Sequence, residues 1–352
     1  MDIDQVKIYL KSLNLPDFRA KQIIKNYFSG RYSSFSQMSD LPLTLRTDLD
    51  NKFSLLSVTE SNLLTSSDTQ KVVLKLNDGL HIESVLMDYG EWTTVCISSQ
   101  VGCPLACSFC ATGKMGLKRN LSVEEIIDQI LFWKNILYLK KNSSPALPAR
   151  RTGGSRNGAG GRFRIVFMGM GEPFLNWDNL LSSLKIINDK NGLNIGSRKI
   201  SISTAGVAPK IIEFANLNTE INLALSLHSG NQKVREQLMP IARQYSLHVL
   251  KKALDFYTHK TNRQVILEYI LIDNQNDQPS DIKLIKEFIG SNFLLHVNII
   301  PLNPVKNGLI PSTHQSEFIQ ALDRVGIPFT VRRSIGQSIN SACGQLITQN
   351  TL

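Results

Sequence analysis

The sequence lacks any apolar run long enough to span a bilayer, for which about 20 residues are needed. Its first residues, Met1 to Asp4, have neither the basic segment nor the apolar core of a secretory signal. These absences argue against a membrane-spanning protein and against a secreted one. We therefore expect a cytoplasmic protein with no membrane partner.

Acidic residues are scarcer than basic ones. The chain has 29 Asp and Glu against 39 Lys and Arg, which gives a formal net charge of +10. This excess suggests a polyanionic partner such as nucleic acid, although many basic proteins bind none. With 352 residues, 42% of them hydrophobic, the chain is long enough for one large globular domain with small attachments.

Cysteine is also scarce, and its count of five is odd. Without an export signal, this argues against a disulfide framework and favours reactive or ligating thiols. Cys103, Cys107 and Cys110 form a Cys-x3-Cys-x2-Cys triplet with no further Cys or His nearby to complete the four-ligand shell of a structural zinc. A 4Fe-4S cluster held by three Cys keeps one iron open for a substrate, so the triplet predicts such a cluster. Taken alone, Cys96 and Cys343 would be inert buried thiols.

The hydrophobic period changes along the N-terminal part of the chain. Apolar residues at helical spacing predict a small helical domain to about residue 65. Residues 70–98 have the pattern of short strands, with a turn at 77–79.

From about residue 120, strand-like runs alternate with amphipathic helices. The expected strands are 165–168, 199–203, 221–226, 265–272 and 295–300. The expected helices are 122–141, 178–189, 207–217, 246–258, 279–289 and 314–325, and Ser122 with Glu125 forms a capping pair for the first. Repeated βα units imply a parallel sheet, either doubly wound or curled into a barrel, with ligands at the carboxyl ends of the strands.

Residues 142–161 interrupt this alternation. The segment is rich in Gly, Pro and Arg and has little to bury, so we predict a disordered basic insertion. It either contacts RNA phosphates or is simply solvated.

Placed at the mouth of such a barrel, the triplet resembles that of the radical S-adenosylmethionine (SAM) superfamily, whose open iron is chelated by the amino and carboxylate groups of SAM. Further segments are similar to the adenine C2-methyltransferases of the RlmN type. They are Phe18–Ile23, Cys96–Cys103, Phe109–Leu121, Phe167–Pro173, Ser203–Gly206, Leu225–His228, Pro301–Pro304 and Ala342–Leu346. The resemblance runs through nearly the whole chain.

The resemblance implies an α/β fold: a partial (β/α) barrel of the radical SAM type with a small N-terminal helical domain and a short β extension. The expected domains are an N-terminal helical, RNA-binding-like domain at 1–65, a β extension at 66–95, the barrel at 96–332, and a catalytic cysteine loop and tail at 333–352.

The resemblance also implies a mechanism. C2 of adenine is electron-poor, so simple nucleophilic displacement cannot methylate it and a radical route is needed. In the family, one SAM methylates the loop cysteine, here Cys343, and a second SAM yields a 5′-deoxyadenosyl radical that takes hydrogen from that methyl group. The carbon radical then joins Cys343 to C2. Release of the RNA needs a base and a second thiol that displaces the sulfur of Cys343 as a disulfide. Glu83 matches the family's base, and Cys96 matches its second thiol.

Seven positions match the family's SAM contacts: Gly171, Glu172, Ser203, Ser226, Leu227, His228 and Asn303. A glycine-rich turn lets the backbone approach SAM, and a carboxylate can pair with its amino group. Judged without the family, Glu83 would be a solvated strand residue and His228 a structural histidine.

The main hypothesis is therefore a radical SAM enzyme that methylates C2 of an adenosine in 23S rRNA and of the adenosine beside the tRNA anticodon. It would use a 4Fe-4S cluster, two SAM per turnover and an electron donor such as flavodoxin or ferredoxin. One alternative is adenine C8 methylation of the same rRNA, which confers antibiotic resistance and uses the same cysteines. The other is a noncatalytic RNA-binding protein with a structural zinc, which would leave Cys96 and Cys343 without a purpose.

Overall fold

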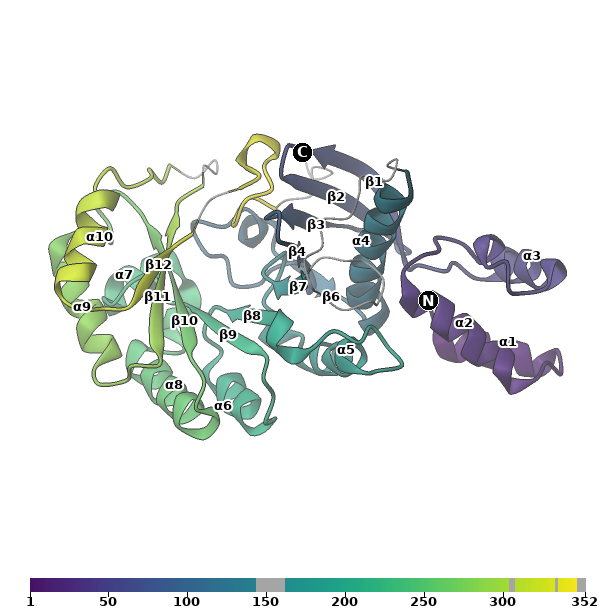
Figure 1. Cartoon of the computed structure of the whole chain (residues 1–352). Coiled ribbons are helices and arrows are strands. Elements are labelled where there is room, and N and C mark those ends of the chain that lie inside the picture. The colour runs from purple at the N-terminus through teal and green to yellow at the C-terminus, as the bar shows by residue number, and fades with distance from the viewer. Residues whose placement is uncertain (144–161, 304–307, 333–334, 347–352) are drawn as a thin grey trace.

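The computed structural model describes residues 1–143, 162–303, 308–332 and 335–346 (Figure 1). Its centre is a ten-stranded sheet in the order β1-β2-β3-β4-β7-β8-β9-β10-β11-β12. These strands are β1 (Val58–Thr65), β2 (Thr69–Leu76), β3 (His81–Asp88), β4 (Trp92–Cys96), β7 (Arg162–Phe167), β8 (Ile200–Thr204), β9 (Asn222–Ser226), β10 (Val265–Leu271), β11 (Leu295–Pro301) and β12 (Phe329–Val331). A separate hairpin pairs β5 (Gln100–Gly102) with β6 (Leu117–Asn120).

The sheet is parallel from β4 to β12, whereas β1, β2 and β3 form an antiparallel extension that pairs with β4. Because the strands keep their chain order across the sheet, the sheet curves in one direction and does not reverse as a doubly wound sheet does. No pairing joins β1 to β12 within the described residues, so the barrel is open. Of the two sheet types that the sequence allowed, the partial barrel is confirmed.

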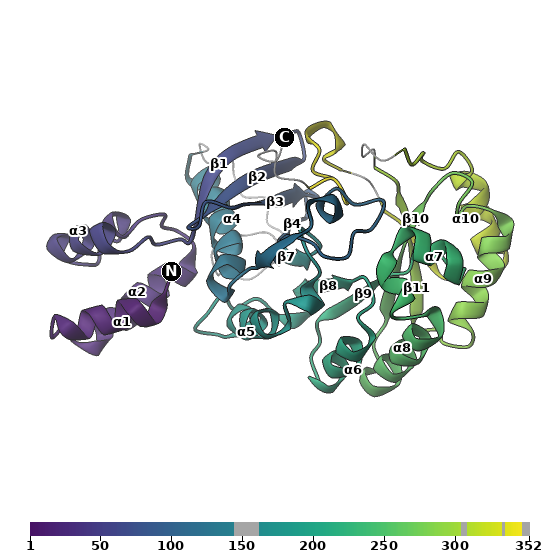
Figure 2. The same cartoon turned by 180° about the vertical axis from the view of Figure 1, so that it is seen from behind.

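Helices lie along the outside of the curved sheet (Figures 1 and 2). They are α4 (Val123–Ser143), α5 (Trp177–Asn188), α6 (Ala208–Asn216), α7 (Gln232–Leu238), α8 (Leu247–Thr261), α9 (Pro279–Ile289) and α10 (Gln315–Arg324). The predicted cap of α4 is present, because the Ser122 N–H donates to Glu125 Oε2 at 2.9 Å and the Glu125 N–H donates to Ser122 Oγ at 3.2 Å. The predicted bounds of these barrel elements hold to within about three residues. Helix α7 and strand β12 were not predicted, since each is too short to show a period.

The N-terminal helices α1 (Ile3–Ser12), α2 (Asp17–Ser29) and α3 (Leu43–Lys52) form a small lobe at one end of the molecule (Figures 1 and 2). Buried Asp128 on α4 joins this lobe to the barrel. It accepts hydrogen bonds from the Tyr27 hydroxyl and, at 2.7 Å, from the backbone N–H of Ser57. The prediction of helices as far as residue 65 is wrong beyond α3, because residues 58–65 form β1. That edge strand is mostly exposed and polar, so its pairing with β2 determines its conformation and its own pattern does not reveal it.

The insertion predicted at 142–161 begins later than expected, because α4 continues to Ser143. The remainder, 144–161, lies outside the described residues. In the part of the chain that the structure describes, no helix is long and apolar enough to cross a membrane.

Candidate active site

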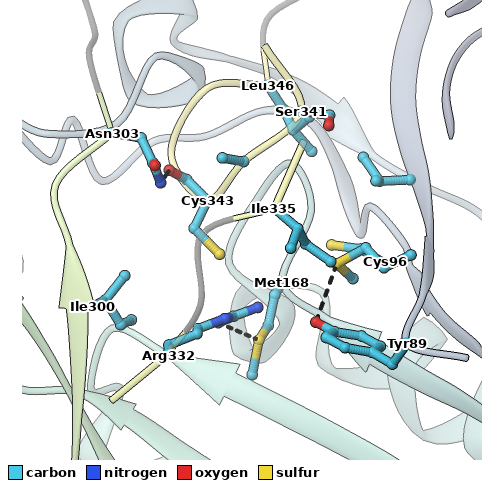
Figure 3. A pocket seen from close by; sticks show the side chains of 13 residues that line it. Tyr89, Cys96, Met168, Ile300, Asn303, Arg332, Ile335, Ser341, Cys343 and Leu346 are labelled. Atoms are coloured by element: carbon cyan, nitrogen blue, oxygen red, sulfur yellow. Dashed lines mark hydrogen bonds between the residues drawn. The ribbon is translucent and has the colours of Figure 1, made fainter. Parts of the chain in front are cut away.

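Two adjoining cavities lie at the carboxyl end of the parallel strands. The first, the cysteine cavity, is lined by Cys96 and Cys343, among others (Figure 3). The second, the triplet cavity, is lined by all three cysteines of the triplet. Residues shared by the two linings are Met168, Ile300, Arg332, Cys343 and Leu346. Cys343 therefore belongs to both cavities.

The cysteine triplet lies in the loop that follows β5, so its expected place after a strand is close to the observed one. The Cys103 N–H donates to the Gly116 carbonyl at 3.1 Å, and the Cys110 N–H donates to the Cys107 carbonyl at 3.1 Å, which folds the loop back on itself. The three thiols line one wall of the triplet cavity, and a 4Fe-4S cluster with one open iron binds three thiolates, each through a different iron.

The glycine-rich turn after β7 packs closely against Gln100. Gly171 has φ +97°, and a Cβ there would lie 2.5 Å from the Cβ of Gln100, so only glycine fits. Gln100 Oε1 in turn accepts the Glu172 N–H at 2.8 Å. This packing fixes the turn against the β5 hairpin and brings Gly171 and Glu172 to the triplet cavity.

The Glu172 carboxylate is buried and held by two backbone donors. Its oxygens accept the Ala205 N–H at 2.7 Å and the Phe174 N–H at 3.1 Å. Burial is the largest influence and raises the pKa of Glu172 to about 7, although these hydrogen bonds oppose the rise. A cationic group bound beside Glu172 would favour its charged form.

Three further predicted SAM contacts, Ser203, Ser226 and His228, line the triplet cavity. Leu227 does not line it: the side chain is fully buried, and the Leu227 N–H donates to the Glu268 carbonyl at 3.0 Å. The predicted Leu227 position is therefore part of the backbone support of the site.

His228 is a buried, neutral histidine, because burial lowers its pKa to about 3. Its Nδ1 accepts the Ile270 N–H at 3.2 Å, which assigns the ring proton to Nε2. Phe109, inside the triplet loop, packs edge-on against the ring with centroids 4.7 Å apart. The histidine thus has a structural role as well as a place on the cavity wall.

Asn303 is located differently from the other predicted SAM contacts. It lines the cysteine cavity and not the triplet cavity. Its Nδ2 donates to the Cys343 carbonyl at 3.0 Å, and its Oδ1 accepts Gln337 Nε2 at 2.9 Å. In this structure Asn303 therefore positions the loop that carries Cys343.

The C-terminal loop docks on the triplet loop through its backbone. The Gly344 carbonyl accepts the Ala111 N–H at 2.8 Å, and the Leu346 carbonyl accepts the Thr112 hydroxyl at 2.6 Å. These contacts, together with Asn303, hold Cys343 at the junction of the two cavities.

Cys96 is at the end of β4 and faces the cysteine cavity beside Val85 of β3. Burial, followed by the nearby Cys343, raises the pKa of Cys96 to about 12, while Arg332 opposes the rise. All five cysteines are free thiols, so the disulfide bond expected from the sequence is not supported. Cys96 and Cys343 nevertheless line the same cavity (Figure 3).

Glu83 lies on β3 and is buried, so its interpretation as solvated surface is wrong. Its Oε1 accepts Lys71 Nζ at 3.0 Å, and the same Nζ donates to the Asn340 carbonyl at 3.1 Å. Two residues from Val85 on one strand, Glu83 shares the face that bounds the cysteine cavity. It does not line either cavity itself.

Sequence reasoning missed two charged residues of the site. Arg332 lines both cavities, and Glu268 of β10 lines the triplet cavity. Arg332 follows the unpredicted strand β12, and Glu268 is a single acidic residue in an otherwise apolar strand. A charged residue inside an otherwise apolar strand is the sequence signal that could have identified Glu268 as a site residue.

An open parallel barrel, three free cysteines in a loop at its carboxyl end and a Gly-Glu turn beside them define a radical SAM enzyme. The sequence pattern of the radical SAM superfamily matches residues 155–285. That of the "Ribosomal RNA large subunit methyltransferase N-terminal domain" matches residues 1–55.

Full-length relatives narrow this class to one family. A "Probable dual-specificity RNA methyltransferase RlmN" of Rhodococcus erythropolis is 37% identical, over 99% of this chain and 94% of the relative. A protein of the same description from Staphylococcus carnosus is 40% identical, over 94% of this chain and 86% of the relative. The crystal structure of a radical SAM methyltransferase from Sphaerobacter thermophilus has a TM-score of 0.86 at 35% identity and covers 98% of this chain and 97% of its own. The chain belongs to the RlmN family of dual-specificity RNA methyltransferases, whose radical SAM membership implies a 4Fe-4S cluster and SAM.

Proposed function

We propose that this enzyme methylates C2 of an adenosine in 23S rRNA and of the adenosine adjacent to the anticodon in tRNA, in the cytoplasm. The observation that supports this most directly is the place of Cys343, which lines the triplet cavity and the cysteine cavity at once. A thiol at that junction can take a methyl group on one side and deliver it on the other.

We assign the three thiols of the triplet to the 4Fe-4S cluster, because they line one cavity from one loop. When bound, the cluster and two SAM per turnover supply the methyl group and the one-electron chemistry that activates it. That chemistry needs a reductant, for which we propose an electron-transfer protein such as flavodoxin or ferredoxin. Glu172 would pair with the ammonium group of SAM, with Gly171, Ser203, Ser226, His228 and the Leu227 backbone around it.

The remaining residues act on the RNA. Cys343 Sγ would carry the methyl group and become bonded through its carbon to C2. Glu83 would remove the C2 proton, and the one electron left on the adduct would have to be taken up by a one-electron acceptor, which the cluster could be when bound. Cys96 Sγ would then attack Cys343 Sγ, so that an S–S bond forms as the S–C bond breaks. The carbon keeps the S–C electron pair and takes up a proton to complete the methyl group. An external thiol must afterwards reduce the disulfide.

Glu83 suits this role because it lies on the face of β3 that bounds the cysteine cavity, where its carboxyl group accepts Lys71 Nζ at 3.0 Å. Lys71 also contacts the Asn340 carbonyl at the start of the cysteine loop. A movement of that loop would therefore alter the pairing of Glu83. We further propose that the N-terminal helical lobe contributes to RNA binding. The domain boundaries at residues 66, 96 and 333 stay a prediction.

The function is tested by purifying the enzyme without oxygen and incubating it with methyl-labelled SAM, a reductant and unmodified 23S rRNA or tRNA. Mass spectrometry of the nucleosides should show 2-methyladenosine, and iron with sulfide should be present in the protein. A labelled 8-methyladenosine would establish the alternative regiochemistry. Bound zinc with no methylated nucleoside would establish the noncatalytic alternative.

Glu172 should make SAM binding depend on pH. Its pKa of about 7 means that the carboxyl group becomes neutral as the pH falls below that value, while the SAM ammonium stays charged. The dissociation constant for SAM, measured by calorimetry on cluster-loaded protein, should therefore rise by up to about tenfold per pH unit below pH 7. Glu172→Gln should bind SAM weakly and without this pH dependence. An unchanged pH profile in the variant would remove Glu172 from the SAM site.

A further inference from the structure

Arg332 has the position of a substrate contact that the proposed mechanism does not use. It is the one Lys or Arg among the described residues that line the two cavities. Its backbone N–H donates to the Ile299 carbonyl at 2.8 Å, which fixes its Cα at the end of β12 beside β11. The guanidinium extends into the space that the Cys343 thiol also faces (Figure 3).

The guanidinium has donors to spare within the described part of the chain. A guanidinium carries five N–H donors, yet its hydrogen bond here is a long one, 3.9 Å from Nη1 to the thioether sulfur of Met168, which is a weak acceptor. No carboxylate of the described residues lies within ion-pair distance of it. Glu268, the acid that lines the same cavity, instead accepts Asn298 Nδ2 at 2.9 Å. Such a cation is poised for an acceptor that arrives with the substrate.

The target atom itself indicates what that acceptor is. C2 of adenine lies between N1 and N3, and each of these ring nitrogens carries an in-plane lone pair. A base that presents C2 to Cys343 Sγ necessarily brings both nitrogens to the junction of the cavities, which Arg332 also lines. We propose that Arg332 donates a hydrogen bond to N1 or N3 of the target adenine and so orients C2 toward Cys343. This inference depends on the proposed C2 methylation.

The same hydrogen bond would assist the reaction. When the carbon radical adds to C2, the unpaired electron moves onto the ring, and loss of the C2 proton then leaves negative charge on the neighbouring nitrogens, which a fixed guanidinium stabilises. Arg332 stays protonated throughout, so it donates without transferring its proton.

The test combines protein variants with RNA in which the target is adenine, 1-deazaadenine or 3-deazaadenine. Arg332→Met keeps an unbranched side chain and removes the donors, and Arg332→Lys keeps a charge. Arg198→Met is the control for the loss of one positive charge, because Arg198 is exposed and pairs with Glu220 away from the cavities. Two quantities are measured: the single-turnover rate of methyl transfer to RNA, and the methylation of Cys343 by protein mass spectrometry.

Arg332→Met should slow methyl transfer to normal RNA by about 10- to 100-fold, as expected for a hydrogen bond from a charged donor. Methylation of Cys343 should stay as in the wild type, because the target adenine of the RNA takes no part in that step. One of the two deaza bases should slow the wild type by a similar factor and leave Arg332→Met unaffected. Arg332→Lys should recover part of the rate, and Arg198→Met should match the wild type.

Two results would overturn the inference alone. In one, both deaza bases slow Arg332→Met as much as they slow the wild type, so that no ring nitrogen contacts Arg332. In the other, Cys343 methylation falls in step with RNA methylation, so that Arg332 acts on the thiol. A wild-type enzyme that produces no 2-methyladenosine would instead overturn the proposed function together with this inference.

Discussion

Cys343→Ala should abolish RNA methylation while leaving the active site assembled. The loop is held through backbone carbonyls, those of Cys343, Gly344 and Leu346, so the substitution removes the thiol without removing a docking contact. Without Cys343 Sγ there is no atom at the cavity junction to carry the methyl group, and the loss should reach the background rate.

The measurement is the formation of 2-methyladenosine together with label on the protein. Cys343→Ala should show neither, while its iron content and SAM affinity equal those of the wild type. This equality separates loss of the carrier from loss of the cofactors. Formation of 2-methyladenosine by Cys343→Ala would show that the methyl group does not pass through this cysteine.

The parts of the fold that the sequence predicts well are those with a strong period. Helix α9 has its expected bounds, and β10 and β11 differ from theirs by one residue. These elements combine a clear apolar pattern with defined ends, such as the proline that opens α9. Strand β1 shows the opposite case: six of its eight residues are exposed, so its own sequence has no strand signal and pairing with β2 fixes it.

The residues of the site also divide into those that the sequence could predict and those that it could not. Residues that are close in sequence, as in the cysteine triplet or the turn at Gly171, lie together on one cavity wall as their spacing predicts. Contacts between distant segments could not be predicted, because they depend on how the C-terminal loop folds back. Asn303 binds the Cys343 carbonyl, Lys71 joins Glu83 to Asn340, and Arg332 enters both cavities only in the folded chain.

Cys96→Ala should stop the enzyme within its first turnover, with RNA bonded to the protein. Cys96 and Cys343 are the two thiols of the cysteine cavity within the described residues, so removing Cys96 leaves the S–C bond with no sulfur to attack it. The product should be a protein–RNA adduct that withstands dithiothreitol, since a thioether is not reduced by thiols. It is measured as a shifted band on a denaturing gel and as a Cys343 peptide that carries one nucleotide after nuclease digestion.

Because Cys96 is buried, the rate at which the adduct is released should depend on pH, which would not be the case if Cys96 had only a structural role. Its pKa of about 12 means that the thiol is almost entirely protonated near neutral pH, and the reactive thiolate fraction increases about tenfold per pH unit below that value. In the wild type, release of the adduct should therefore accelerate with pH between about 7 and 9. The adduct of Cys96→Ala should persist at every pH, and Cys96→Ala/Cys343→Ala should form none. Repeated turnover by Cys96→Ala would show that another group releases the RNA and that the cysteine cavity does not serve disulfide formation.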